Sequence, residues 1–329
     1  MPAREPDPRD VLILPAPPPD AVVSYGPHAD HVADVRLPLT GSAPLVVVIH
    51  GGFWRAEYDR SHTGHLAAAL VAEGYPVAQL EYRRTGPGAD GGWPTTFDDV
   101  VAGLAALPAL VASVAAALGR PAPAAGAPVL IGHSAGGHLA LWYAAHAAAA
   151  SVEVRPGAPA REAPTAPGAP TTPTDVPPGA HAREAPTAPG APATPTDVPP
   201  GAHARVALTV PAAVLALAPV ADLAEAHRLD LDGGAVAALL GGDPTTRAEA
   251  YAAAEPLPTM PLRSPTVIVH GTADVQVPIS LSRRYAAAGR AAGSEIALSE
   301  LPNVGHFELI DPRSAAWRKV TEALRSLHQ

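Results

Sequence analysis

Short apolar runs that alternate with helical stretches constrain the fold of this chain more than any other feature. Residues 45–49 read Leu-Val-Val-Val-Ile, a continuous apolar run typical of a strand that is buried on both faces. Such strands need helices packed on both sides of the sheet, and a connection between parallel strands is long enough to contain one. The pattern therefore predicts an α/β fold.

The remaining elements follow from the same periodicities. We expect strands at residues 21–25, 31–37, 44–50, 75–82, 128–132, 212–219, 265–270 and 295–301. We expect helices at residues 61–73, 96–118, 135–150, 221–240, 280–292 and 314–327. This order predicts a mostly parallel central sheet of about eight strands flanked by helices. The two opening strands have no helix between them, which favours an antiparallel start.

A tandem repeat interrupts this alternation. Residues 161–182 recur as residues 183–204 with a single change, and residues 155–204 contain 14 Pro and 5 Gly. The repeat contains few large apolar side chains, so it cannot bury enough surface to offset its ordering entropy. We expect residues 151–205 to be a disordered, partly polyproline-II insertion before the sixth strand. It reads as a duplication in a tolerant surface loop rather than as a docking arm.

The length of 329 residues then suits one large domain, formed by residues 21–150 and 206–329, with residues 1–20 as a flexible N-terminal tail. The absence of cysteine excludes disulfides, Cys-ligated zinc and Cys nucleophiles. A net charge of −9 argues against a nucleic-acid binder. No targeting or membrane-spanning segment is visible, so we expect a cytoplasmic protein. We expect no metal and no cofactor.

The pentapeptide Gly132-His133-Ser134-Ala135-Gly136 lies between an expected strand and an expected helix. In that context a Gly-x-Ser-x-Gly sequence predicts a tight turn that lifts the serine above the sheet. The turn also places Ser134 at a helix N-terminus, where the dipole favours developing negative charge. We therefore expect Ser134 to be a nucleophile rather than a serine of an ordinary turn.

A second glycine pair, Gly51-Gly52, follows an earlier buried strand and precedes Phe53 and Trp54. Adjacent glycines let the backbone approach a substrate closely, with its N–H groups facing outward. Together with the N–H of Ala135, the N–H groups of Gly52 and Phe53 are candidates for an oxyanion hole, with Gly51 as the fallback. We expect His50 to form a hydrogen bond within this loop and to orient it.

The acid and the base are expected later in the chain. Asp274 follows the strand at 265–270, and we prefer it to Asp222, which also follows a strand. His306 follows the last expected strand, next to a glycine that allows close approach. The order Ser134, Asp274, His306 is the order in which α/β-hydrolases carry their triads.

These motifs resemble the α/β-hydrolase superfamily over residues 21–150 and 206–329. Within it, the His-Gly-Gly-x-Trp sequence at 50–54, the Gly-His-Ser-Ala-Gly-Gly sequence at 132–137 and the His-Gly-x-x-Asp-x-x-Val-Pro pattern at 270–278 resemble the kynurenine formamidase and small carboxylesterase group. Phe53 stands where hormone-sensitive-lipase-like esterases carry a third glycine. The repeat precedes the sixth strand, whereas lids usually follow it. The resemblance therefore implies an α/β-hydrolase fold with a rather open site.

A serine hydrolase that cleaves small ester or amide substrates through an acyl-enzyme is the expected function, with a carboxylesterase foremost. An arylformamidase acting on N-formylkynurenine is the alternative and rests on the motif that contains Trp54. A prolyl-oligopeptidase-like peptidase would need room for an N-terminal propeller, and a non-catalytic binding protein would lack a member of the triad. We expect Trp54, His133 and Phe307 at the substrate pocket. The sequence leaves the oligomeric state open.

Overall fold

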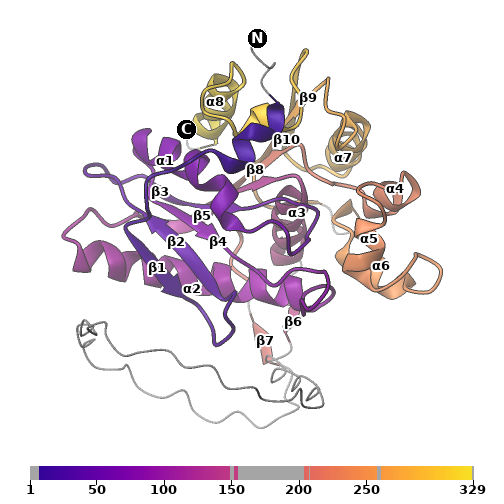
Figure 1. Ribbon diagram of the computed structural model, residues 1–329, viewed down its shortest axis with the longest axis horizontal. Helices are drawn as coiled ribbons and strands as arrows, with labels where there is room; N and C mark the ends of the chain where they lie inside the picture. The colour runs from indigo at the N-terminus through magenta and orange to yellow at the C-terminus, as the bar shows by residue number, and fades with distance from the viewer. Residues whose placement is uncertain (1–6, 149–151, 155–203, 207, 258–260, 328–329) are drawn as a thin grey trace, which may run out of the picture. The chain divides into compact units, whose positions relative to one another are not determined.

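The computed structural model describes residues 7–148, 152–154, 204–206, 208–257 and 261–327. A sheet of eight strands lies at its centre, in the order β1-β2-β4-β3-β5-β8-β9-β10 (Figure 1). The strands are β1 (Ala21–Ser24), β2 (Val32–Arg36), β3 (Pro44–Ile49), β4 (Val77–Leu80), β5 (Ala124–His133), β8 (Ala213–Leu217), β9 (Thr266–Gly271) and β10 (Ile296–Leu301). The predicted α/β class with a central sheet of about eight strands is confirmed.

The direction of the strands places the functional loops. β1 pairs antiparallel with β2, and β2 pairs antiparallel with β4, as the missing helix between the opening strands indicated. The remaining pairings, from β4 with β3 to β9 with β10, are parallel. The carboxyl ends of β3, β5, β9 and β10 therefore lie at one edge of the sheet, where ligands bind in open α/β folds.

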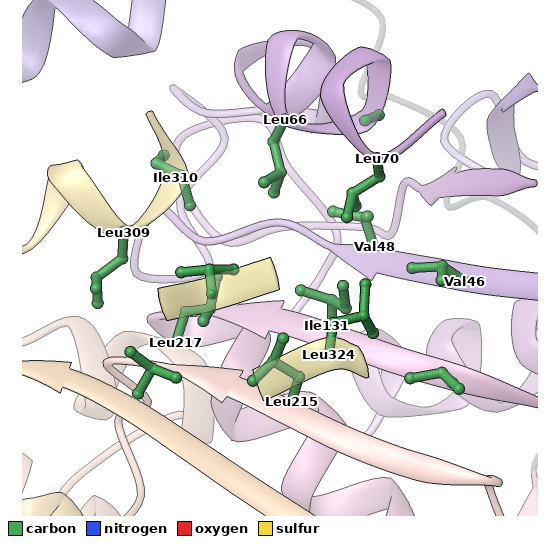
Figure 2. Packing of buried hydrophobic residues seen from close by; sticks show 14 of the residues in the cluster. Val46, Val48, Leu66, Leu70, Ile131, Leu215, Leu217, Leu309, Ile310 and Leu324 are labelled. Atoms are coloured by element: carbon green, nitrogen blue, oxygen red, sulfur yellow. The ribbon is translucent and has the colours of Figure 1, made fainter. Parts of the chain in front are cut away.

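Helices cover both faces of the sheet. α1 (Gly64–Ala72) and α8 (Trp317–Ser326) pack on one face, and α2 (Thr95–Ala117), α3 (Ala135–Ala148) and α7 (Ile279–Ala291) pack on the other. Alternate strand residues such as Val46, Val48 and Ile131 point toward α1 and α8, where they meet Leu66 and Leu324 (Figure 2). This alternation is the period of two that a pleated strand imposes, and the resulting core fixes the strand ends that carry the site.

α2 is long and apolar enough, by length and composition, to cross a membrane. In the structure it contacts β2, β4 and α3. Its side chains Phe97, Val100 and Leu107 are buried. These contacts are those of a core helix of this domain.

The N-terminal segment differs from the expected flexible tail. Residues 8–13 form a 3-10 helix, η1 (Pro8–Ile13), whose first turn is capped by Asp7, which accepts a hydrogen bond from the Arg9 N–H at 2.9 Å. Val11 is only 2% exposed and belongs to the same core as α1 and α8. A six-residue 3-10 helix with one buried residue has no amphipathic periodicity to detect, so no sequence pattern predicts it.

The proline-rich insertion is described only at its ends. β6 (Val152–Val154) and β7 (Ala204–Val206) pair in a separate two-stranded sheet, and the expectation that residues 151–205 form a disordered insertion stays a prediction. The chain divides into one unit formed by Met1–Glu153 and Arg205–Gln329 and a second formed by Val154–Ala204. The rest of the predicted insertion, residues 155–203, lies outside the described residues.

The single helix expected at 221–240 is divided into α4 (Leu223–Arg228) and α5 (Ala235–Leu240), and α6 (Ala248–Ala254) follows. Asp230, Asp232, Gly233 and Gly234 between the first two helices have positive φ angles, which a right-handed helix cannot contain. The break forms a loop that reaches the carboxyl edge of the sheet, because Asp232 lines the pocket described below.

Candidate active site

A pocket opens at the carboxyl edge of the sheet and brings together residues that are far apart in sequence. It contains about 490 Å³ of empty space and is open to solvent. Its lining comes from strand-end loops, the short helix η2 (Arg60–Thr63), the loop before α5 and the N-terminal segment. The lining residues are Arg9, Leu12, Gly52, Phe53, Tyr58, His62, His133, Ser134, Asp232, Gln276, His306 and Phe307.

Ser134 is the single residue between β5, which ends at His133, and α3, which begins at Ala135. Its φ of 57° lies in the left-handed region, which is strained for a residue with a Cβ. The turn is tight enough that a Cβ on Gly136 would lie 2.0 Å from the Ile49 carbonyl oxygen. The local geometry is therefore the strained strand-to-helix turn that the pentapeptide predicted, with Ser134 facing the pocket.

The loop after β3 runs against this turn. Gly52, Phe53 and Trp54 have φ angles of 97°, 48° and 57°. Left-handed conformations in aromatic residues cost of the order of 1–3 kcal/mol each. The Trp54 carbonyl holds the loop by accepting hydrogen bonds from the Thr85 backbone N–H at 2.7 Å and the Thr85 hydroxyl at 3.0 Å. Strain that is retained by such contacts is a mark of functional sites.

The N–H groups of this region are available to a ligand. Within the described part of the chain, the backbone N–H groups of Gly52, Phe53 and Ala135 donate no hydrogen bond. A Cβ on Gly51 would lie 3.1 Å from the Ser134 Cβ, so the loop directly adjoins the serine. These donors lie where an oxygen atom bound next to Ser134 would need them.

Asp274 and His306 meet beside the serine. The His306 Nδ1–H donates to Asp274 Oδ2 at 2.6 Å, and the side chain of Asp274 is fully buried. The other carboxylate oxygen, Oδ1, accepts the backbone N–H groups of Gln276 and Val277, each at 2.8 Å. A proton held on Nδ1 leaves Nε2 of His306 with a free lone pair, which is the form that a general base requires.

A second imidazole holds the same carboxylate. Nε2 of the buried His270 lies 3.2 Å from Asp274 Oδ2 and donates to the Val277 carbonyl at 2.9 Å, while Nδ1 bonds the Ser282 hydroxyl at 2.7 Å. Burial alone would raise the pKa of Asp274, but the hydrogen bonds from His270 and His306 outweigh it and hold that pKa well below its ordinary value. The carboxylate is therefore ionised under all ordinary conditions.

His306 and Ser134 face the same pocket but form no direct hydrogen bond in this structure. His133 fixes the backbone of the histidine loop, because its Nε2–H donates to the His306 carbonyl at 3.2 Å. Burial, reinforced by the neighbouring His306, lowers the pKa of His133 well below its ordinary value. His133 is thus a neutral donor that lines the pocket, as expected. Catalytic hydrogen bonds often shorten only when substrate is bound.

Beneath the glycine loop lies a buried charged pair. His50 donates from Nδ1 to the Gly51 carbonyl at 2.8 Å and from Nε2 to Glu81 Oε1 at 2.9 Å. Both ring nitrogens therefore face oxygens that only accept. Burial would raise the pKa of Glu81, but the charge and the hydrogen bond of His50, together with the charge of Arg84 and the Arg60 N–H, outweigh it and lower that pKa to about 2. The pair fixes the loop that His50 was expected to orient.

The residues expected at the substrate pocket do not all line it. Phe53 and Phe307 line the pocket, as does His133. Trp54 does not; it is fully buried and packs edge-on against His138, with ring centroids 5.3 Å apart. Asp222, the alternative acid, instead caps α4 by accepting the Glu225 N–H at 2.8 Å and bonds Arg284.

Several pocket residues gave no signal in the sequence. They are Arg9, Leu12, Tyr58, His62, Asp232 and Gln276. None belongs to a motif, and each reaches the pocket through packing between segments distant in sequence. Burial lowers the pKa of His62 to about 3, so this ring is a neutral wall of the pocket. Among the residues that the structure describes, no cluster of three or more His, Asp or Glu side chains could hold a metal ion.

Comparisons with known proteins agree with this architecture. The BD-FAE family matches residues 34–163 of the chain. No curated protein sequence matches it significantly.

Among solved structures, a truncated carbohydrate esterase from gut microbiota is similar with a TM-score of 0.64 at 18% identity, covering 93% of this chain and 94% of that one. Esterase B of Lactobacillus rhamnosis is similar with a TM-score of 0.65 at 18% identity, covering 97% of this chain and 89% of that one. The butyrate-bound esterase Est2 of the planctomycete Thermogutta terrifontis is similar with a TM-score of 0.60 at 18% identity, covering 93% of this chain and 92% of that one. At this level of identity the likeness concerns the fold, and the predicted α/β-hydrolase fold is confirmed. The particular resemblance to kynurenine formamidases receives no such support.

Proposed function

We propose that this protein is a carboxylesterase that hydrolyses small esters through an acyl-enzyme formed on Ser134. The observation that carries the proposal is the convergence of three groups on one pocket. These are a serine in a strained turn, an imidazole bonded at 2.6 Å to a buried carboxylate, and backbone N–H groups free to bind an oxyanion. The esterase titles of the similar solved structures support the same class of reaction.

The proposed mechanism assigns one task to each group. Nε2 of His306 removes the hydroxyl proton as Ser134 Oγ attacks the ester carbonyl carbon. Asp274 keeps the remaining proton on Nδ1 and stabilises the imidazolium that forms. The N–H groups of Gly52, Phe53 and Ala135 bind the negative oxygen of the tetrahedral intermediate. His306 then protonates the departing alkoxide, and water, activated by the same imidazole, releases the acid.

The pocket walls favour a short acyl group. Phe53, Tyr58 and Phe307 are bulky side chains around the serine, and they are joined by Leu12 of the N-terminal segment. We therefore propose acetyl to butyryl esters as the preferred acyl groups. The arylformamidase alternative rested on the motif residue Trp54, which the structure places outside the pocket, so no observation favours it.

A chain-length series tests this function. Rates should be measured on para-nitrophenyl esters from acetyl to dodecanoyl, with N-formylkynurenine in parallel. The wild-type protein should be fastest on the short esters, and Ser134→Ala should lose nearly all activity, by roughly 10⁶ in comparable triads. Ser113→Ala is the matched control, because Ser113 is an exposed residue of α2 that bonds only the Ala109 carbonyl. Full activity in Ser134→Ala, or a strong preference for N-formylkynurenine, would contradict the proposal.

A further inference from the structure

The N-terminal segment is a fixed part of the pocket wall. Val11 anchors it in the core at 2% exposure, and the Asp7 cap holds its first turn. η1 contacts η2, which carries His62, and η4 (Phe307–Ile310), which begins directly after His306. A segment that is fixed at both the core and the histidine loop can hold a side chain at a defined place beside the reacting atoms.

Two side chains of η1 reach that place. Arg9 and Leu12 line the pocket that contains Ser134 and His306. Arg9 also lines the adjoining hollow, together with Gln276, Phe307, the same His306 and the acidic residues Asp7 and Glu308. Arg9 therefore lies at the junction between the catalytic pocket and the space into which a longer substrate would extend.

The charges at this junction do not cancel. Within the described part of the chain, the Arg9 guanidinium has no ion-pair partner and is the only Arg or Lys side chain that lines the catalytic pocket. The acidic lining residue Asp232 is bound by Arg55 through both its carboxylate and its carbonyl. The Asp274 carboxylate is buried behind His306. Among the lining residues of the catalytic pocket, Arg9 is therefore the one cation without an ion pair, while the carboxylates Asp7 and Glu308 line only the adjoining hollow.

We propose that Arg9 binds a carboxylate of the substrate, so that the enzyme prefers esters that carry a free carboxylate on the acyl or alcohol part. This inference rests on the proposed esterase function. A guanidinium presents parallel N–H donors that match the two oxygens of a carboxylate. Because Val11 holds η1 in the core, the backbone that carries Arg9 needs no further ordering when the substrate binds, and only the Arg9 side chain has to be ordered.

Pairs of isosteric substrates test the inference on both sides of the ester. On the acyl side, the mono-para-nitrophenyl ester of adipic acid is compared with para-nitrophenyl hexanoate. On the alcohol side, para-acetoxybenzoate is compared with para-acetoxybenzamide. The variant is Arg9→Gln, and Arg263→Gln is the matched control, because exposed Arg263 precedes β9 at the opposite edge of the sheet.

In at least one pair, the wild type should favour the charged ester, and Arg9→Gln should lower the charged-to-neutral ratio of kcat/KM about ten- to hundredfold, mainly through KM. Arg263→Gln should leave the ratio unchanged, and added salt should reduce it in the wild type. A ratio that is the same in Arg9→Gln and in the wild type for both pairs overturns the inference while the esterase function stands.

A binding measurement separates the two proposals. If the wild type hydrolyses none of these esters, the proposed function fails, and calorimetry with para-hydroxybenzoate and adipate decides the inference alone. Binding of either acid to the wild type and its loss in Arg9→Gln support a carboxylate site. Equal binding to both proteins, or binding to neither, overturns it.

Discussion

The two sides of the pocket that contains Ser134 are held in place by different physical means. On one side, the groups proposed for chemistry lie within a few residues of the ends of β3, β5, β9 and β10, where strain and short hydrogen bonds fix them. On the other side, Arg9, Leu12 and Asp232 lie on the N-terminal helix and an irregular loop, held by packing and by exposed ion pairs.

This difference teaches how the site divides its tasks. Groups that take part in bond making must hold their geometry within fractions of an ångström, and strand ends in a buried sheet provide that rigidity. Groups that select substrates tolerate more movement and are found on segments that can change without disturbing the sheet. Changes on the strand-end side should therefore reduce the rate strongly, and changes on the other side should alter selectivity.

After the loss expected in Ser134→Ala, the largest effect is expected at the carboxylate. In Asp274→Asn, an amide NH₂ at the position of Oδ1 would face the backbone N–H groups of Gln276 and Val277. At the position of Oδ2 it would face the imidazoles of His270 and His306 and give His306 the wrong tautomer. We expect kcat on para-nitrophenyl butyrate to fall by roughly 10⁴, as for the equivalent change in serine proteases. Thermal unfolding should show that the variant is folded. A loss smaller than about tenfold would mean that Asp274 does not orient the base.

A smaller effect is expected in the glycine loop. Gly52 has a φ of 97°, and a Cβ there would lie 2.4 Å from the Tyr58 Cβ, so Gly52→Ala must displace the N–H groups beside Ser134. Loss of one oxyanion donor costs about 10²–10³ in kcat. Gly74→Ala is the matched control, because Gly74 has a φ of 95° with nothing within 4 Å of the added Cβ. Similar kcat values for the two variants would contradict the assigned oxyanion loop.

On the selective side, Leu12→Ala should change chain-length preference and leave kcat on acetyl esters nearly unchanged. Removing this side chain frees space for further methylenes, each worth about 0.8 kcal/mol when buried, so octanoyl relative to butyryl esters should gain about three- to tenfold in kcat/KM. Ile13→Ala on the same helix is the control, because Ile13 is 82% exposed and does not line the pocket. An equal shift in both variants would show that Leu12 does not bound the pocket.

The smallest effect on catalysis is expected at Glu255, which lines neither side. Burial raises its pKa from 4.5 to about 7. The folded state therefore binds the proton more tightly than the unfolded state, and its contribution to stability is lost as pH rises from about 4.5 to about 7. Glu255→Gln should remove up to about 3 kcal/mol of this pH dependence and leave kcat unchanged. Denaturant unfolding at several pH values measures this dependence. A free energy of unfolding that changes with pH by the same amount in Glu255→Gln and in the wild type would contradict the assignment.

The strand-end side could be predicted from the sequence because its chemistry depends on local patterns. A serine between two glycines after an apolar run, or a glycine pair after a buried strand, already specifies the backbone conformation. The same logic placed Asp274 after β9 and His306 after β10, which the structure brings within 2.6 Å of each other. The eight strands were found for a similar reason, since buried parallel strands are continuous apolar runs.

The remaining parts depend on tertiary packing that no local pattern records. η1 is six residues long, and its place at the pocket is set by the single buried side chain of Val11. Trp54 belongs to a motif, yet its left-handed φ turns it into the core beside His138, away from the substrate. Residues 221–240 were expected to be mostly helical, and the positive φ angles between Asp230 and Gly234 divide this stretch into two short helices.

The most direct test of the account is the identity of the residue that becomes acylated. The wild-type protein should be treated with a fluorophosphonate, digested and mapped by mass spectrometry, with Ser134→Ala treated in parallel. We predict a single adduct on Ser134 in the wild type and none in the variant, because among the serines that the structure describes only this one lines the pocket with His306 and the glycine loop. An adduct on another serine, or labelling that persists in Ser134→Ala, would contradict the account.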